Sequence, residues 1–496
     1  MQNVLTFLEE TAKKYPNKSA VSLLNNKISF NELMHLAKKT GAVIAENGFK
    51  NKAIGVIAER DISTIVFFFS IAYSGNFYVP IDPDMPAEKK KSIIEDSGMR
   101  IILGSEESRN ITEEIGFDGT YITLNDIGET ECSIPETDEV TPLYMVYTSG
   151  STGKPKGVLK SHKAVISYIN AYCSVFDFSE NDIIGNQTPF FFDASAKDIY
   201  LMLKTGASIE IIPTEKFAMP TELIEYLNEK KITFISWVPT ALAIVAQLKT
   251  FTYILPETLK KVFFVGEVMP MKHLNKWREA LPNLQYVNLY GQSELAGICC
   301  YYEVAGEFED SSVLPMGKAM PNCKIYLLDS DGIVISEPTK IGEMYIVSDS
   351  LALEYYNDAE RTEKNFLIRD FGYGEVRCFK TGDLAYLDEK GNFIFTSRSD
   401  FQIKHMGHRI ELGEIEAVAG ALDEIQRCCC MYNAEKKRIV LFAELSEGIE
   451  CTGREIQSKL KTRLSSYMLP SRVVIMEKLP LNANGKIDRQ KIKESL

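Results

Sequence analysis

Hydrophobic residues follow two different periods along most of this chain. A spacing of three to four positions, which predicts amphipathic helices, occurs at residues 31–47, 221–230 and 271–280. Short β-rich apolar runs separate such segments, at residues 53–57, 208–212, 232–237 and 261–265. Helices that alternate with short buried strands are typical of layered α/β structures with largely parallel sheets. The pattern therefore predicts an α/β fold for the larger part of the chain.

The pattern changes beyond residue 324. Runs at residues 325–328, 344–347 and 393–395 are typical of hairpins, and we expect a more antiparallel subdomain there. In about the last hundred residues, helical patterns at 412–422 and 454–464 are mixed with strand patterns at 438–444 and 472–476, which predicts a small α+β domain. We therefore expect a large N-terminal domain of layered α/β subdomains, residues 1–399, and a small C-terminal domain, residues 400–496.

The size and charge of the chain exclude several classes of protein. Its 496 residues are 45% hydrophobic, so it can bury large cores and is expected to form two or more domains. The formal net charge is −13, whereas binding to nucleic acids or anionic membranes needs clustered Lys and Arg side chains that this acidic chain does not show. We therefore expect no nucleic acid among its partners.

The sequence also argues against export and membrane insertion. Residues 1–17 carry acidic and basic side chains without a long apolar core, unlike a secretory signal. The apolar run at 62–73 is shorter than the ~20 residues that span a bilayer and predicts a buried helix. Ten cysteines lie scattered or adjacent, as at 299–300 and 428–430, without metal-ligand spacing or a disulfide framework. We expect a cytoplasmic protein with reduced thiols.

Residues 147–157 combine glycines, hydroxyls and lysines in the sequence Tyr-Thr-Ser-Gly-Ser-Thr-Gly-Lys-Pro-Lys-Gly. Glycine lets backbone N–H groups turn towards an anion, and hydroxyl and ammonium groups add donors and charge, so these residue types favour polyphosphate binding. The segment does not match a P-loop, because Pro155 stands where that motif needs Ser or Thr. The alternative is a solvated linker. The apolar run at 143–147 predicts a strand before the loop, which is where nucleotide phosphates usually bind in α/β proteins.

This loop resembles the phosphate-binding signature of the adenylate-forming superfamily. That superfamily includes acyl-CoA synthetases, luciferases and the amino-acid adenylation domains of nonribosomal peptide synthetases. Further segments that resemble its motifs occur in the expected order, at residues 79–83, 192–195, 288–294, 380–383, 397–404 and 482–488. The resemblance covers essentially the whole chain. It implies that a carboxylate attacks the α-phosphorus of ATP, with Mg²⁺ on the phosphates, to give acyl-AMP and pyrophosphate.

The resemblance implies roles for three residues at the reaction centre. Lys486 matches the catalytic lysine of the family, Glu294 matches its magnesium-binding glutamate, and Ser293 would offer a hydroxyl to the α-phosphate. From local sequence alone, a solvated lysine near a C-terminus is the favoured interpretation of Lys486, and the ordered family motifs reverse that preference. By the same resemblance, the hinge between the two domains is expected at Asp400.

The same motifs imply a nucleotide-binding set. Tyr290 is expected to stack on adenine, Asn288 to bond the adenine amino group, and Asp383 to accept from both ribose hydroxyls with help from Arg398. Tyr-Gly and Gly-Asp dipeptides are also typical of ordinary turns, which is the alternative for both motifs. The full expected set is Thr148, Ser149, Gly150, Ser151, Thr152, Gly153, Lys156, Gly266, Asn288, Tyr290, Gly291, Asp383 and Arg398.

Asp193 decides the expected substrate class. In the amino-acid-activating members that this chain resembles, an aspartate at this position pairs with the α-ammonium group of the substrate, whereas acyl-CoA and aryl synthetases usually lack it. The alternative is a helix N-cap, because Asp193 precedes a helical pattern. The side-chain pocket is expected to include Ala194, Lys197, Ser236, Phe263, Val265, Leu289, Gly297 and Ile298.

Lys197 lies one helical turn beyond Asp193 and leaves two interpretations open. It could pair with an acidic side chain of the substrate, which would make aspartate or glutamate the preferred amino acid. It could instead neutralise Asp193 or Asp198, or extend to solvent.

Segments 264–270 and 400–404 are similar to the D-alanine:carrier-protein ligases of cell-wall modification, but the pocket residues differ from that branch. D-Alanine is therefore the second candidate substrate. Because the chain stops ten residues after Lys486, we expect a free-standing enzyme that loads the phosphopantetheine of a separate carrier protein. An acyl-CoA ligase is a further alternative, against which Asp193 speaks. A non-enzymatic ATP-binding regulator is the last alternative, and the presence of Lys486, Glu294 and Asp383 speaks against it.

Overall fold

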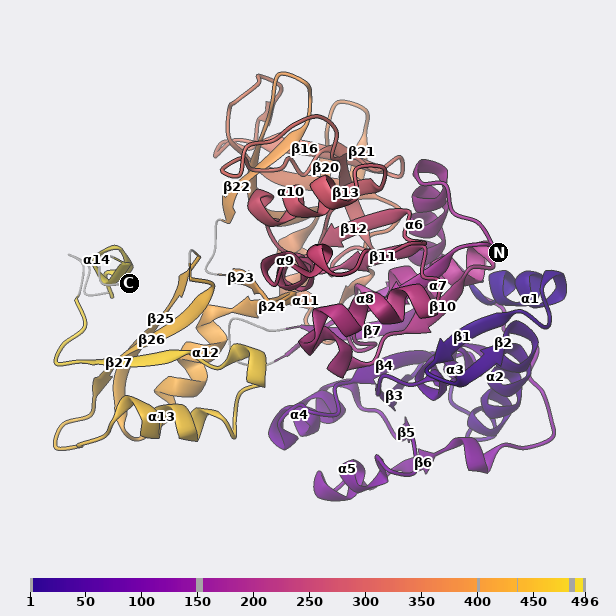
Figure 1. The fold of residues 1–496 in the computed structure, drawn as a ribbon. Coiled ribbons are helices and arrows are strands. Elements are labelled where there is room, and N and C mark those ends of the chain that lie inside the picture. The colour runs from indigo at the N-terminus through magenta and orange to yellow at the C-terminus, as the bar shows by residue number, and fades with distance from the viewer. Residues whose placement is uncertain (1–2, 149–154, 399–401, 435, 481–486, 494–496) are drawn as a thin grey trace. The chain divides into compact units, whose positions relative to one another are not determined.

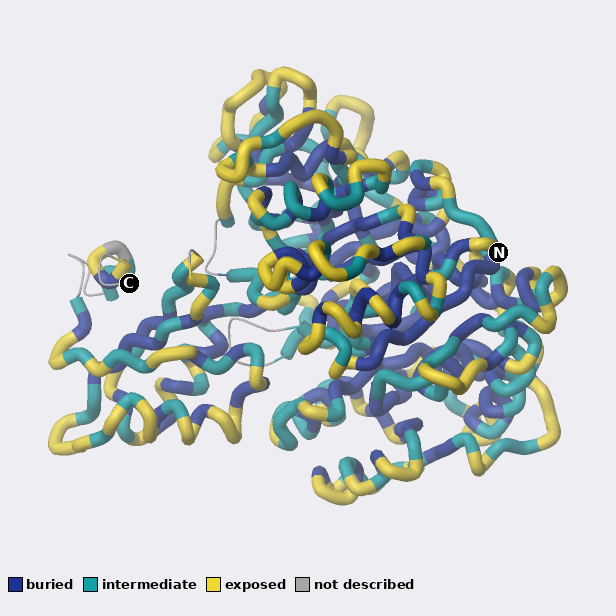
Figure 2. The backbone as a smooth tube through the Cα atoms, viewed as in Figure 1, coloured by how far each residue is buried: buried dark blue, intermediate teal, exposed yellow. Residues whose placement is uncertain are grey.

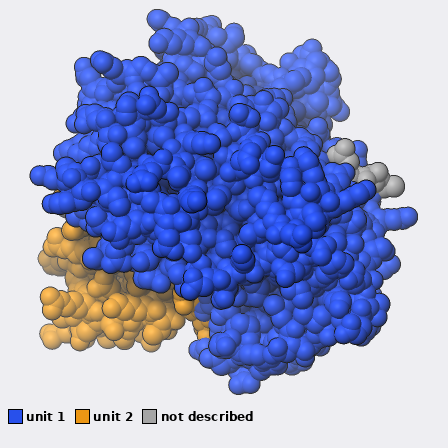
Figure 3. Space-filling view, turned by 45° about the vertical axis from the view of Figure 1, so that its right-hand side comes forward, with its two compact units in different colours: residues 1–83, 97–146, 157–399 blue, residues 84–96, 147–156, 400–496 orange. Residues whose placement is uncertain are grey.

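The computed structural model describes residues 3–148, 155–398, 402–434, 436–480 and 487–493. The chain divides into two compact units, which Figure 3 draws in different colours. The first unit comprises residues 1–83, 97–146 and 157–399, and the second comprises residues 84–96, 147–156 and 400–496.

A nine-stranded, mainly parallel sheet forms the centre of the first unit (Figure 1). Its strand order is β15-β14-β13-β12-β11-β9-β10-β1-β2, and all neighbours from β13 to β1 pair in parallel. This arrangement confirms the parallel sheet that the alternating pattern predicts. The strands are β1 Ser19–Leu23, β2 Asn26–Ser29, β9 Ile183–Asn186, β10 Ser208–Ile211, β11 Phe234–Trp237, β12 Lys261–Val265, β13 Gln285–Gly291, β14 Ile298–Glu303 and β15 Lys318–Ala319.

Helices cover both faces of this sheet because successive side chains of a strand point to opposite faces. On β12, Val262 and Phe264 pack in one hydrophobic cluster and Phe263 packs in another. The cluster of Val262 and Phe264 contains α8 Pro220–Glu229, α9 Pro239–Gln247 and α10 Met271–Ala280. The cluster of Phe263 contains α1 Leu5–Lys14, α6 His162–Val175 and α7 Ser195–Thr205.

A seven-stranded sheet with the order β19-β8-β7-β4-β3-β5-β6 shares this second cluster. Its strands are β3 Ala53–Ile57, β4 Phe77–Ile81, β5 Ile101–Leu103, β6 Thr120–Ile122, β7 Pro142–Thr148, β8 Lys156–Ser161 and β19 Glu354–Tyr355. The apolar run at 62–73 forms helix α3, Ile62–Tyr73, whose residues 64–73 are all buried, as predicted. Helix α2, Phe30–Ala45, packs beside it and begins with a capping box between Ser29 and Glu32. The short helices here are α5 Arg109–Glu114 and η1 Leu124–Asp126.

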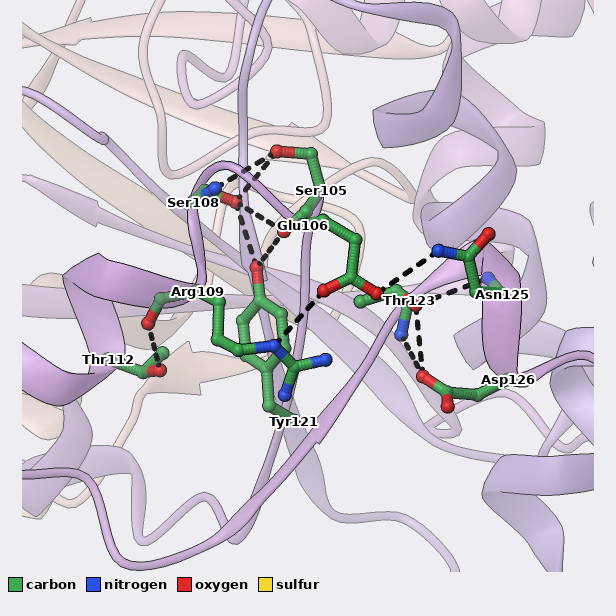
Figure 4. Close-up of polar contacts among 9 residues, drawn as sticks. All are labelled: Ser105, Glu106, Ser108, Arg109, Thr112, Tyr121, Thr123, Asn125 and Asp126. Atoms are coloured by element: carbon green, nitrogen blue, oxygen red, sulfur yellow. Dashed lines mark hydrogen bonds and ion pairs between the residues drawn. The ribbon is translucent and has the colours of Figure 1, made fainter.

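A network of polar side chains joins the loops after β5 and β6 (Figure 4). Glu106 accepts from Arg109 at 3.1 Å, Thr123 at 3.0 Å and Asn125 at 3.1 Å. These donors lower the pKa of Glu106. These contacts tie together the two loops at one edge of the sheet.

The third sheet of the first unit is antiparallel, as the hairpin pattern beyond residue 324 predicts. Its order is β17-β16-β18-β21-β20, with β22 paired to β21. The strands are β16 Cys323–Leu328, β17 Val334–Ile335, β18 Gly342–Ser348, β20 Phe366–Asp370, β21 Glu375–Leu387 and β22 Phe393–Arg398. The other short elements of the first unit are η2 Thr214–Ala218, η3 Thr250–Thr252 and α11 Ala359–Asn365.

The second unit has a small α+β core, in agreement with the predicted C-terminal fold. Its two sheets are β23-β24 and β25-β26-β27. The strand β25 contains the three adjacent cysteines, and Cys429 and Cys430 belong to different hydrophobic clusters because they face opposite sides of the strand. The elements are α4 Ala87–Ser97, β23 Gln402–His405, β24 His408–Glu411, α12 Leu412–Gly420, β25 Ile425–Asn433, β26 Arg438–Leu445, α13 Gly453–Leu460, η4 Ser466–Met468, β27 Arg472–Met476 and α14 Arg489–Lys493.

In both units, the buried residues lie largely in the sheets and in the elements packed against them (Figure 2). All ten cysteines are free thiols, as expected from their spacing. Within the described ranges, none of the helices has both the length and the apolar character needed to cross a bilayer.

Candidate active site

Asp193 lies just before α7 and receives hydrogen bonds from two strands of the seven-stranded sheet. The hydroxyl of Tyr144 on β7 donates to Asp193 Oδ1 at 2.9 Å, and the ammonium group of Lys160 on β8 contacts the same oxygen. Neither bond involves Oδ2, and no described residue donates to that oxygen. The N-cap of α7 is Ala194, which forms no side-chain cap, so Asp193 is not the helix cap that local sequence allowed.

The charges of Lys160 and Glu294 affect the pKa of the Asp193 carboxylate. The side chain of Lys160 is 0% exposed and that of Asp193 is 16% exposed. Burial raises the pKa of Asp193, and the charge of Lys160 and the bond from Tyr144 oppose this effect. Burial lowers the pKa of Lys160, and Asp193 opposes that change. The charge of Glu294 further raises the pKa of Asp193, so the candidate ammonium-binding and magnesium-binding carboxylates lie in one electrostatic environment.

Glu294 follows β13 and is completely buried. The hydroxyl of Tyr355 on β19 donates to Glu294 Oε1 at 2.7 Å, and the backbone N–H of Ala352 donates to its carbonyl at 2.8 Å. A carboxylate together with phosphate oxygens is a normal ligand set for Mg²⁺. The described residues include no group of three or more His, Cys, Asp and Glu side chains that could hold a metal. Glu294, preceded by the half-buried Ser293, is thus the type of ligand that Mg²⁺ takes beside phosphate oxygens, and its role as that ligand stays a prediction.

Asp383 is the acceptor for three side chains. The register of β21 and β22 places Arg398 opposite Asp383, and the two form an ion pair. The hydroxyl of Tyr290 donates to Asp383 Oδ2, and Gln292 Nε2 donates to the same oxygen at 2.6 Å. Gln292 also donates to the Tyr290 hydroxyl at 3.1 Å. These contacts bring Tyr290 and Arg398, two expected nucleotide-binding residues, to the carboxylate of a third, Asp383.

The other expected nucleotide-binding residues of the first unit lie on or near β12 and β13. The amide of Asn288 donates to the carbonyl of Pro315 at 2.7 Å. A Cβ atom at Gly291 would lie 2.6 Å from the carbonyl oxygen of Gly297, so only glycine fits this close approach of two backbones. Gly266 follows β12 with a φ of 98°, which favours glycine.

The pocket residue Lys197 pairs inside the fold. Its ammonium group contacts the carboxylate of Asp198, which also accepts from Asn186 at 3.0 Å. The same ammonium lies 5.8 Å from the centre of the Phe234 ring, and that ring is 5.1 Å from the ring of Phe263. The structure therefore favours the internal pairing over the interpretation in which Lys197 waits for an acidic substrate.

The remaining pocket candidates differ in burial. Ser236, Leu289 and Ile298 are buried, Val265 and Gly297 are half-buried, and Ala194 is exposed. A Cβ atom at Gly297 would lie 2.3 Å from the ring of Tyr168, so the aromatic ring fills the space of a side chain there. Ser236 Oγ is buried and has no hydrogen-bond partner among the described residues.

Seven expected site residues lie outside the described residues. They are Ser149, Gly150, Ser151, Thr152, Gly153, Lys486 and the expected hinge residue Asp400. Of the glycine-rich segment, Thr148 ends β7 and Lys156 begins β8. Their roles stay predictions.

Sequence reasoning missed Lys160, Tyr144, Gln292 and Tyr355. Lys160 carried a signal, because it stands in the otherwise apolar run Val158-Leu159-Lys160 of a strand. A lysine that is buried needs a partner. Its partner lies 33 positions away in the sequence, which no local pattern identifies.

Comparisons with known proteins identify the family of this chain. The model of the AMP-binding enzyme family matches residues 8–356, and that of the AMP-binding enzyme C-terminal domain matches residues 414–486. Tyrocidine synthase 1 of Brevibacillus parabrevis is 30% identical over 99% of this chain and 45% of its own length. Zwittermicin A synthase ZmaJ of Bacillus cereus is 30% identical over 97% of this chain and 93% of its own length.

This chain spans less than half the length of the first curated relatives that it matches. Among solved structures, that of holo-PA1221, an NRPS protein containing adenylation and PCP domains, superposes with a TM-score of 0.87. It is 22% identical and covers 100% of this chain and 84% of that one, which shows a shared fold. Because the first family model alone covers most of the sequence, the chain belongs to the AMP-binding enzyme family of adenylate-forming ligases.

Proposed function

We propose that this protein activates an amino acid as aminoacyl-AMP and transfers it to the phosphopantetheine thiol of a carrier protein. In the first step, a carboxylate oxygen of the amino acid attacks the α-phosphorus of ATP, the bond from that phosphorus to its bridging oxygen breaks, and pyrophosphate leaves. In the second step, the thiol sulfur attacks the acyl carbon, AMP leaves, and the thiol proton passes to solvent.

One observation carries the choice of an amino acid. Asp193 is largely buried, and its Oδ2 has no hydrogen-bond donor among the described residues. A buried carboxylate with an open oxygen is suited to hold a donor on the substrate. The charge of Glu294 acts on the same carboxylate, which supports a site where substrate and metal-bound phosphate meet.

Other side chains bind the ribose of ATP, Mg²⁺ and the reacting oxygens. Asp383, held by Tyr290, Gln292 and Arg398, accepts from the ribose hydroxyls of ATP. Glu294 is the protein ligand of Mg²⁺, which would neutralise charge on the phosphates. Lys486 supplies the cation for the reacting oxygens, and rotation about Asp400 separates the two half-reactions. These last two roles rest on the family motif alone.

Two features of the partners complete the proposal. We expect the carrier to be a separate protein, and the relative described as containing adenylation and PCP domains supports a carrier partner in general. We also expect the reaction to take place in the cytoplasm, where free thiols such as the ten cysteines persist.

Amino-acid-dependent exchange of pyrophosphate into ATP tests this function. The panel contains the common amino acids and D-alanine, with fatty and aryl acids as controls. Exchange with an amino acid supports the proposal, exchange with D-alanine alone selects the ligase of cell-wall modification, and exchange only with fatty or aryl acids selects an acyl-CoA ligase.

A further inference from the structure

Lys160 is a fully buried cation at the candidate substrate carboxylate, and no motif assigns it a role. Its side chain is 0% exposed, and its ammonium group contacts Asp193 Oδ1. The same ammonium lies 5.0 Å from the centre of the Tyr144 ring. The neighbouring β8 residues Val158, Leu159 and Ser161 are buried too and carry no charge, so Asp193 is the contacting partner that makes this buried lysine tolerable.

The pairing changes what a substrate meets at Asp193. A buried carboxylate without a counter-ion would need a cation from the substrate. Here Lys160 already supplies one, and Tyr144 adds a hydrogen bond to the same oxygen. What Asp193 offers is the acceptor Oδ2 of a charge-compensated pair.

An ammonium group and a hydroxyl group differ in the free energy with which they bind such an acceptor. An ammonium group must lose its hydration and is repelled by the buried charge of Lys160 as well as attracted by Asp193. A hydroxyl group donates the same hydrogen bond with a much smaller desolvation cost and without repulsion. Lys160 already compensates the negative charge of Asp193. A substrate ammonium group at the α-carbon therefore keeps little of its advantage in binding free energy over a hydroxyl group.

We propose that Lys160 widens the substrate class of this protein, so that it adenylates 2-hydroxy acids about as well as the corresponding 2-amino acids. The inference rests on the proposed adenylation at this site and concerns only the group on the α-carbon. The reaction needs no further reactant, because the same carboxylate oxygen attacks ATP and the same pyrophosphate leaves. Lys160 acts through Asp193 and is a positioning residue.

Matched pairs of acids test this proposal in the pyrophosphate exchange assay. Each pair shares its side chain, as in alanine with lactate, valine with 2-hydroxyisovalerate, and phenylalanine with phenyllactate. For the preferred side chain of the wild-type protein, the two kcat/KM values should lie within about tenfold of each other. Lys160→Met should raise the ratio of amino acid to hydroxy acid by about tenfold or more, mainly through KM, and Lys160→Arg should preserve the wild-type ratio.

The ratio separates specificity from damage to the fold, because a structural defect lowers both activities together. If Lys160→Met does not fold, as judged by circular dichroism, the wild-type ratio decides alone. A wild-type preference for amino acids well above tenfold overturns the proposal, as does a ratio that Lys160→Met leaves unchanged. If amino acids support exchange and hydroxy acids do not, only this inference fails. If no acid supports exchange, the proposed function fails with it.

Discussion

The ammonium group of Lys197 contacts the carboxylate of Asp198, its neighbour on α7, and both side chains are almost completely buried. Asn186 donates to the second oxygen of Asp198 at 3.0 Å, so this carboxylate is satisfied inside the protein. The pair removes the reason to expect an acidic substrate, since the charge of Lys197 is already matched.

Breaking this pair should destabilise the protein. Lys197→Met leaves the carboxylate of Asp198 without its counter-ion, and we expect a loss of about 3–5 kcal/mol in the free energy of unfolding. Lys197→Met/Asp198→Leu removes both charges and should recover most of the loss. Urea unfolding of the three proteins measures the effect. A cost below about 1 kcal/mol for the single variant, typical of a surface pair, would contradict the buried pairing.

Much of the fold was predictable because the spacing of hydrophobic residues within a short stretch of sequence indicates a helix or a strand. The runs at 53–57 and 261–265 form strands with those bounds, and 271–280 forms a helix with those bounds. The site was less predictable, because its contacts join residues that are distant in sequence. Lys160 meets Asp193 only after β8 enters a sheet beside β7, and Tyr290 meets Asp383 across 93 positions.

Gln292 should matter for ATP binding through Asp383. Its amide donates to Asp383 Oδ2 at 2.6 Å and to the Tyr290 hydroxyl at 3.1 Å. Gln292→Leu removes a hydrogen bond to a charged group, so the KM for ATP should rise about tenfold. Gln285→Leu on β13, the strand that ends just before Gln292, is the matched control, because Gln285 contacts Glu303 at an exposed position. An equal effect of both changes on KM would show that Gln292 does not act through Asp383.

Tyr355 should increase the affinity of the proposed site for Mg²⁺. It donates to Glu294 Oε1 at 2.7 Å, and loss of such a partner of a metal-binding carboxylate typically costs about tenfold or more in metal affinity. Tyr355→Phe should therefore raise the Mg²⁺ concentration needed for half-maximal exchange. Tyr253→Phe, at a position 81% exposed, should leave it unchanged. An unaltered Mg²⁺ requirement in Tyr355→Phe would count against Glu294 as a ligand.

His162 should make the first unit sensitive to acid. It is buried at the start of α6, its Nδ1 accepts from the backbone N–H of Val4 at 3.4 Å, and burial lowers its pKa to about 3. Because the unfolded imidazole binds a proton near pH 6.5 and the folded one does not, stability is lost as the pH falls below 6.5. The loss should reach about 2 kcal/mol at pH 5.

The variant His162→Gln keeps a hydrogen-bond acceptor and cannot titrate. Its free energy of unfolding, measured in urea at pH 7 and pH 5, should fall less between the two values than that of the wild type. If both proteins lose the same amount, His162 is not the group responsible.

We propose that Asp193 selects a substrate with a hydrogen-bond donor at its α-carbon. The most direct measurement compares pyrophosphate exchange by the wild type and by Lys160→Met/Asp193→Val, which removes both members of the buried pair. The amino acid preferred by the wild type and its analogue without the amino group serve as substrates. We predict that the double variant loses the preference for the amino acid by about 100-fold while its KM for ATP is unchanged. Retention of the wild-type preference by the double variant would show that Asp193 does not select the substrate.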